Sequence, residues 1–335
     1  MNPTLTHGRT ATLVASVSLV AVLAACMPAF GEGGSVSSRP PTEPGASLPS
    51  SVPTASAAPS AAPTAPGSTA TPAPATQPPR TAPAVTPPPA EQMSLTVYFF
   101  MPDEDGNPKL VPVERRVPRT VAVARAAMGE LLRGPSADEA AFRTPISTAI
   151  PRDTILLDIT ISEGVATVDL SREFESGGGS ASMLGRLAQV VYTLTQFPTV
   201  QSVNFRLDGE PVEVFSGEGI VLDGPSAREH YTEQLPEIFA DRPAFGSTPS
   251  KPVRVTGLTR VFEATFIVGL YDKDGDEITR QVVTATCGTG CWGSFDVSLP
   301  YDVDVRQTGS LVVWAGSARD GSPENVRSYP VGLEP

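Results

Sequence analysis

The chain has 335 residues, 40% hydrophobic residues and a net charge of −12 at pH 7. The length suggests about two domains, and because an acidic surface repels phosphate backbones we expect no nucleic-acid partner. Only two histidines are present, and His230 is the one outside the first 25 residues, which leaves few histidine-based catalytic arrangements open.

Residues 1–25 are typical of a signal peptide. An apolar run from Ala11 to Ala25 follows a basic start, and it is too short for a comfortable membrane span, which takes roughly 20 residues. The run ends Leu-Ala-Ala-Cys at Cys26, which resembles a bacterial lipobox. We expect Cys26 to become the mature N-terminus and to carry the acyl chains of a membrane anchor. The alternative is an ordinary signal peptide with a chance cysteine at its cleavage site.

Residues 26–92 form a low-complexity segment of Pro, Ala, Ser, Thr and Gly. Such a segment has too few large apolar side chains to offset the entropy of ordering the chain. We therefore expect a disordered, Pro-rich linker with polyproline character, which acts as a spacer between the anchor and the folded part. A Pro-rich ligand, a wall-binding tract and an O-glycosylated stalk are the alternatives.

Residues 93–235 predict an α+β domain. Turn residues and hydrophobic periodicity indicate strands over 95–100, 110–117, 155–161, 165–170, 200–207 and 212–214, and helices over 121–133 and 180–195. Thr120 is the expected N-cap of the first helix, and Gly134-Pro135 is expected to end it. The order of elements predicts helices packed against a mainly antiparallel sheet.

Two groups of residues in this domain could take part in catalysis or ligand binding. Asp169, Arg172 and Glu173 follow a strand end, where charged side chains are usually solvated. Gly177–Gly179 precede a helix and could hold an anion, but the Lys-Ser/Thr of a P-loop is missing. We expect no catalytic residue and no metal site here.

Four stretches carry a resemblance to a known family. They are Leu95–Met101, Arg133-Gly134-Pro135, Val168–Ser171 and Val203–Gly209. In this order they resemble the GerMN domain, which is named for sporulation and spore-germination proteins and occurs in many cell-envelope lipoproteins. The resemblance implies a domain that is not catalytic.

A connector is expected over residues 236–250, followed by an all-β domain over residues 251–335. Short alternating segments predict strands over 253–255, 261–271, 278–286, 292–299, 310–315 and 326–333. Helical periodicity does not appear in this part of the sequence. Strands at this spacing favour an immunoglobulin-like β-sandwich.

The most specific motif of the chain is Cys-Gly-Thr-Gly-Cys-Trp-Gly, from Cys287 to Gly293. Together with Val261–Ala264 and Phe295 it resembles the immunoglobulin-like domain found with GerMN in bacterial spore-germination proteins. Outside the cytosol we expect a disulfide between Cys287 and Cys291. A zinc site would need about four ligands, and a redox pair usually has two-residue spacing.

Trp292 and Trp314 are expected in the core, because tryptophan is more often buried than displayed. An exposed aromatic at a sugar-binding face is the alternative, so both are possible binding residues. The acidic stretch Asp272–Asp276 departs from the EF-hand pattern and is expected to be a hairpin turn.

These features together predict a non-enzymatic, membrane-anchored extracytoplasmic lipoprotein without cofactors, which acts as a binding or scaffold module at the cell envelope. Its expected partners are the membrane, through the lipid anchor, and an envelope protein or peptidoglycan. One alternative is an accessory regulator of an envelope sensor kinase or transporter. Another is a cell-wall hydrolase that uses Asp169, Glu173 or His230.

Overall fold

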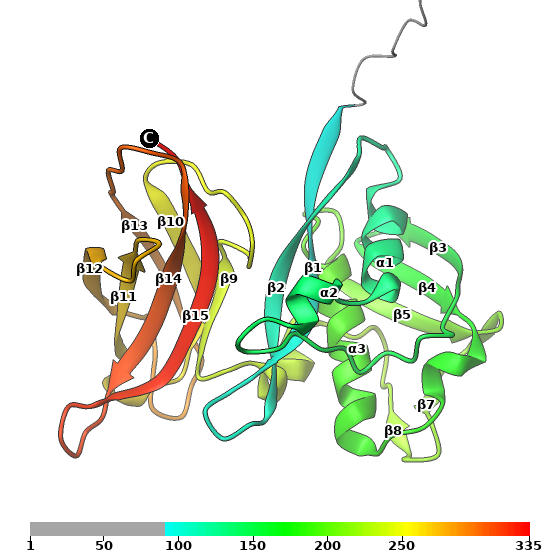
Figure 1. Ribbon diagram of the computed structural model, residues 1–335. Coiled ribbons are helices and arrows are strands. Elements are labelled where there is room, and N and C mark those ends of the chain that lie inside the picture. The colour runs from blue at the N-terminus through cyan, green and yellow to red at the C-terminus, as the bar shows by residue number, and fades with distance from the viewer. Residues whose placement is uncertain (1–90) are drawn as a thin grey trace, which may run out of the picture. The chain divides into compact units, whose positions relative to one another are not determined.

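The computed structural model describes residues 91–335. The expected signal peptide, Cys26 and nearly all of the expected linker lie outside the described residues. None of the helices in the described part combines the length and the apolar character needed to cross a membrane. The described residues form an α+β domain followed by an all-β domain (Figure 1).

The first domain opens with a long β-hairpin. Its strands β1 (Gln92–Pro102) and β2 (Pro108–Pro118) pair antiparallel along their whole length. Neighbouring residues Val97, Tyr98 and Phe99 are all buried although they alternate between the two faces of β1. The continuous apolar run that predicted a buried strand is therefore confirmed, because both faces of this hairpin are covered.

A second sheet has the order β3-β4-β5-β6, with α1 and α3 beside it (Figure 1). Its elements are β3 (Leu156–Ser162), β4 (Val165–Leu170), β5 (Ser202–Leu207), β6 (Glu210–Pro211) and the crossover helix α3 (Ser180–Leu194). Two of its three strand pairings are antiparallel, as predicted, and the central pair, β4 and β5, runs parallel. The reason is the helix between them, which returns the chain to its starting edge and so makes the next strand parallel.

The remaining elements of this domain are α1 (Val123–Arg133), α2 (Ala137–Ala140), β7 (Val214–Phe215), β8 (Ile220–Val221) and the 3₁₀ helices η1 (Arg172–Glu175) and η2 (Arg228–Gln234). α1 starts two residues later than predicted, with Ala122 at the N-cap position. Thr120 does not cap the helix, because its hydroxyl accepts the Ala122 N–H (3.1 Å) before the first turn. Of the strand predicted over 212–214, only Val214 lies in a strand, β7, because β6 ends at Pro211.

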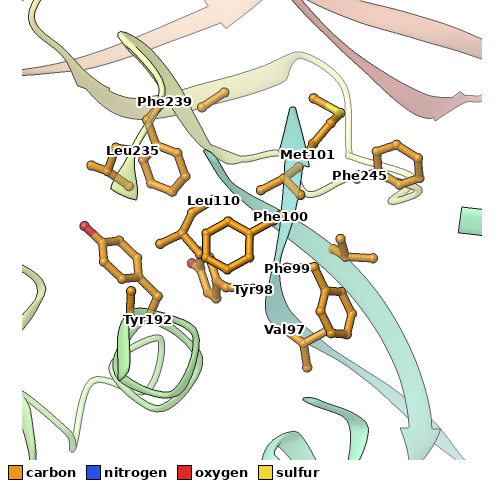
Figure 2. Packing of buried hydrophobic residues seen from close by; sticks show 14 of the residues in the cluster. Val97, Tyr98, Phe99, Phe100, Met101, Leu110, Tyr192, Leu235, Phe239 and Phe245 are labelled. Carbon is orange, nitrogen blue, oxygen red and sulfur yellow. The ribbon is translucent and has the colours of Figure 1, made fainter. Parts of the chain in front are cut away.

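Aromatic side chains fill the core next to the hairpin. The ring of Tyr98 lies 5.4 Å from that of Tyr192 on α3 and 6.5 Å from that of Phe239. Figure 2 shows these rings packed near the buried Leu110 of β2. The hairpin, α3 and the segment that follows η2 therefore share one core.

The second domain is a sandwich of two sheets, as predicted, and it has seven strands where six were expected. One sheet has the order β13-β10-β9 and consists of β9 (Ile238–Arg242), β10 (Val253–Thr259) and β13 (Gly293–Leu299). The other has the order β12-β11-β14-β15 and consists of β11 (Thr265–Tyr271), β12 (Glu277–Thr284), β14 (Gln307–Gly316) and β15 (Pro323–Leu333). Strict alternation of buried and exposed residues along β13 shows that one face of each strand points into the sandwich.

Two expectations for this domain are corrected. The strand predicted over 261–271 is interrupted by the 3₁₀ turn η3 (Phe262–Ala264), where Glu263 and Ala264 have positive φ. The segment expected as a connector contains β9, which pairs with β10. β9 has only three consecutive buried residues, Ile238–Ala240, which is too short a run for periodicity to reveal.

Candidate functional site

The loop from Cys287 to Cys291 is closed by the expected disulfide, with Cα atoms 5.9 Å apart. The Thr289 N–H donates to the Val261 carbonyl (3.2 Å), and the Thr289 hydroxyl accepts the Glu263 N–H (3.0 Å). The disulfide loop therefore holds η3, whose strained positive-φ residues need such support.

Gly288 is required by this contact. A Cβ at this position would lie 2.5 Å from the Ala264 Cα and 2.6 Å from the Val261 carbonyl oxygen. Both neighbours are backbone atoms that cannot turn aside, so the loop can sit against η3 only because residue 288 has no side chain.

Trp292 follows the disulfide loop and is partly buried against the core. The Arg260 guanidinium lies 5.0 Å from the centre of its ring, within cation–π distance. Arg260 is itself held by Glu237 (2.8 Å) and Glu233 (2.7 Å). Hydrogen bonds that Arg260 donates to Glu237 raise the pKa of Arg260, so the cation that covers Trp292 is permanent. Trp292 is thus engaged within its own domain.

Trp314 has different surroundings. It lies on β14 opposite Ile267 of β11, on the face of the four-stranded sheet that points away from the sandwich interior. A Cβ at Gly269 would lie 2.9 Å from the Tyr271 ring and 3.2 Å from the Trp314 ring. The two aromatic side chains therefore converge over a glycine that leaves room for them, and both stay half-exposed.

This outer surface is here named the aromatic face. It consists of Ile267, Gly269, Tyr271, Val282, Val312 and Trp314, which are cross-strand neighbours on β11, β12 and β14. Val282 is 65% exposed, so apolar area continues beyond the rings. At the rim, Arg280 and Glu277 form an ion pair (3.5 Å). Partial burial and the nearby Glu277 charge raise the pKa of Tyr271, which keeps its phenol neutral and able to donate.

The two tryptophans named from the sequence do not come together, because Trp292 precedes β13 in one sheet and Trp314 lies in the other. Neither is fully buried, so the expectation of two core tryptophans is wrong for Trp314 and only partly right for Trp292. The cause for Trp314 is its position in the strand, which places it outward in the alternation of β14.

The residues named for a possible hydrolase occupy structural roles. Asp169 accepts the Gly209 N–H (3.0 Å), and His230 Nδ1 accepts the Ala227 N–H (3.2 Å). Hydrogen bonds from Ser171 and from its own backbone lower the pKa of Glu173, which favours the ionised form and not a proton donor. Within residues 91–335, three or more potential metal ligands nowhere gather into a cluster.

A partly buried polar cluster was not predicted from the sequence. Tyr98 donates to Asp241 (2.5 Å), and Arg228 donates to Asp241 (3.1 Å) and to the Tyr98 oxygen (3.2 Å). The Arg228 guanidinium also lies over the rings of Tyr192 (4.6 Å) and Tyr98 (5.3 Å). In the sequence Arg228 stands in the polar stretch 228–231, and no local signal marks Tyr98 as its partner, because the two residues are 130 positions apart.

Two family models match this chain. The family described as Sporulation and spore germination (Germane) matches residues 96–213. The family described as Immunoglobulin-like domain of bacterial spore germination (Gmad2) matches residues 237–322. Their order along the chain is the order of the two structural domains.

Lipoprotein LpqB of Thermobifida fusca (strain YX) is 31% identical over 136 residues, which is 39% of this chain and 21% of that protein. The chain therefore spans about a fifth of the length of that relative. The first GerMN domain of the sporulation protein GerM from Bacillus subtilis is 21% identical, with a TM-score of 0.34, and covers 40% of this chain and 98% of its own. The tandem GerMN domains of the same protein give 16% identity, a TM-score of 0.36, and 62% coverage of each chain.

Proposed function

We propose that this chain, which carries a sporulation and spore-germination domain followed by an immunoglobulin-like domain of bacterial spore germination, is a lipid-anchored extracytoplasmic protein that binds a component of the cell envelope. The anchor is Cys26, and the binding surface is the aromatic face. The lipobox-like sequence before Cys26 and the similarity to a protein named as a lipoprotein support the anchor.

The observation that carries the binding role is the half-exposed pair Trp314 and Tyr271 above Gly269. Tryptophan and tyrosine provide much of the binding energy at interfaces, because a rigid ring buries a large apolar area at low entropic cost. Contiguous exposed apolar area bordered by polar groups is typical of interaction sites. The aromatic face has both properties, with Val282 extending the apolar part and the Arg280–Glu277 pair at the rim.

The test is retention of the full chain on purified cell wall and on detergent-solubilised envelope proteins from cells that lack it. Trp314→Ala is expected to lower retention by about tenfold or more, as for an aromatic at the centre of an interface. Trp292→Ala is the matched control, because it removes the same side chain from a position that Arg260 covers. It should leave retention nearly unchanged.

Retention on the wall identifies a glycan-containing ligand, and recovery of one defined protein identifies a protein partner. Equal retention of the wild type and Trp314→Ala would exclude the aromatic face as the binding surface. Release of soluble wall fragments by the wild type would replace the binding role with hydrolysis.

Cys26→Ser should move the chain from the membrane fraction to the medium, and an unchanged membrane fraction would exclude this anchor.

A further inference from the structure

A small cleft lies where the β1–β2 hairpin turn, the segment after η2 and the start of β15 meet. Its volume is ≈ 220 Å³. Pockets for drug-sized ligands are roughly 300–1,000 Å³, so this cleft suits a smaller molecule. It is lined by Asp103, Glu104, Asp105, Asn107, Lys109, Pro236, Glu237, Asn325, Val326 and Arg327.

Arg327 is a buried, charged side chain of this cleft that lacks an anionic partner among residues 91–335. It lies on β15 opposite Val313 and is only 4% exposed. Its Nη1 donates weakly to the Met101 carbonyl (3.4 Å), next to the hairpin turn. Its Nε and Nη2 have no acceptor among residues 91–335, and none of the carboxylates there forms an ion pair with it. A buried guanidinium without an anion destabilises the folded state, because burial removes its hydration and nothing replaces it.

Two carboxylates of the cleft are already engaged by the protein. Glu104 accepts the N–H groups of Asn325 (2.8 Å) and Val326 (3.0 Å). Glu237 is held by Arg260 at 2.8 Å. These groups shape the cleft and do not need a ligand.

The groups that are left have opposite charges. Asp105 is exposed, and its carboxylate has no hydrogen-bond partner within the described part of the chain. Asp103 is engaged in the turn, where it accepts the N–H groups of Asp105 (3.1 Å) and Asn107 (2.7 Å) and the Asn107 side-chain amide (3.3 Å). On the positive side stand Arg327 and Lys109, whose Nζ donates to the Glu233 carbonyl (2.9 Å). A simple anion would meet Asp105, and a simple cation would meet the buried guanidinium.

We propose that this cleft binds a free α-amino acid, with the ligand carboxylate at Arg327 and the ligand ammonium at Asp105. A molecule with both charges a few bonds apart satisfies both sides of the cleft, whereas an ion of either sign satisfies only one. Guanidinium–carboxylate hydrogen bonds are among the strongest that proteins form. The site is separate from the aromatic face and does not rest on the proposed envelope-binding role.

The experiment is thermal unfolding and titration calorimetry of the detergent-solubilised full chain with three probes at equal ionic strength: L-alanine, acetate and ethylamine. A ligand that binds only the folded state raises the midpoint of unfolding. L-alanine is expected to raise it, and acetate and ethylamine, which each lack one charge, are expected to have little effect.

Arg327→Met should change the midpoint of thermal unfolding in two ways. Without ligand it should unfold at a higher temperature than the wild type, because it removes an unpaired buried charge while keeping a long side chain. With L-alanine it should show no further rise. A midpoint that rises equally in the wild type and in Arg327→Met would overturn the assignment of the carboxylate to Arg327.

Asp105→Asn should leave the fold intact, because residue 105 is an exposed turn position. It should weaken L-alanine binding about tenfold, the usual effect of losing one charge-assisted hydrogen bond. The turn Asp272–Asp276 supplies the matched control, since Asp272 accepts the N–H groups of Asp274 and Asp276 in the same way (both 2.9 Å). Asp274→Asn should leave binding unchanged. Equal affinity for the three probes, or no binding of L-alanine by the wild type, would overturn the proposal.

Discussion

Tyr98 is the residue whose ionisation matters most for this fold. Burial and the Asp241 carboxylate raise its pKa above the usual value near 10. A raised pKa in the folded state means that folding favours the neutral phenol. The stabilisation is therefore complete below about pH 10, where the unfolded tyrosine is also neutral, and it decreases as pH rises further.

The variant Tyr98→Phe tests this pH dependence of stability. At neutral pH the variant should lose about 1 kcal/mol of unfolding free energy, the typical net contribution of a hydrogen bond. Above about pH 10 the wild type loses stability through Tyr98 and the variant does not, so the difference between them should shrink. The measurement is urea unfolding of both chains from pH 7 to 11. A difference that stays constant over this range would contradict the assigned role of Tyr98.

Individual residues show how far the candidate site could be predicted from the sequence. Cys287 and Cys291 were paired correctly, because spacing and compartment are local information. The exposure of Trp314 was missed because a strand has two faces, and only pairing with β11 and β15 decides which one is covered. Arg228 and Arg327 were missed for a related reason: their burial depends on Tyr98 and Met101, which are distant in the sequence.

At the scale of elements, the disulfide loop and η3 depend on each other. The chain-entropy model gives about 2 kcal/mol for closing so short a loop. Replacing both Cys287 and Cys291 by serine should lower the free energy of unfolding by about that amount, because η3 then loses its fixed support at Val261 and Glu263. Urea unfolding followed by tryptophan fluorescence measures the loss, since Trp292 adjoins the loop.

The matched comparison for this prediction is the wild type under reducing conditions, which breaks the same bond without changing side-chain size. Reduced wild type and the double serine variant should have equal stability. A double variant as stable as the oxidised wild type would show that η3 is held by other contacts alone. A larger loss in the variant than in the reduced wild type would point to the serine side chains themselves.

Elements were easier to predict than their arrangement. The hairpin β1–β2 and the helix α3 came from runs and periodicity within 15 residues, which the sequence displays directly. The parallel pairing of β4 and β5 needed the connection through α3 to be considered, and not only the strands. β9 was missed because its identity as a strand comes from β10, its partner across the region assumed to be a linker.

At the scale of the whole described molecule, β9 and the residues after it join the two domains. β9 pairs with β10 of the sandwich, while its Asp241 accepts from Tyr98 of the hairpin. A few residues on, Phe245 donates its N–H to the Pro112 carbonyl (2.8 Å) and accepts the Glu114 N–H (3.0 Å). Backbone bonds, a partly buried side-chain cluster and a shared core therefore cross the boundary, which favours cooperative unfolding.

The chain provides one probe for each domain. Both tryptophans, Trp292 and Trp314, lie in the second domain, and the α-helices of the described residues all lie in the first. Tryptophan fluorescence thus follows the sandwich, and circular dichroism at the helix band follows the α+β domain. In the wild type we expect the two midpoints of urea unfolding to coincide.

Phe245→Ala should separate the two midpoints. Phe245 is buried at the boundary, where its ring meets Phe142 edge-on at 5.0 Å, and truncating a buried phenylalanine costs about 3–5 kcal/mol. Phe266→Ala removes an equally buried ring from the interior of the sandwich, where it contacts Phe295 at 4.8 Å. That control should lower both midpoints together, since the boundary stays intact. Midpoints that already differ in the wild type would mean that the contacts around Phe245 do not couple the domains, and the cleft at Arg327, which both domains line, would then be lost when the less stable domain unfolds.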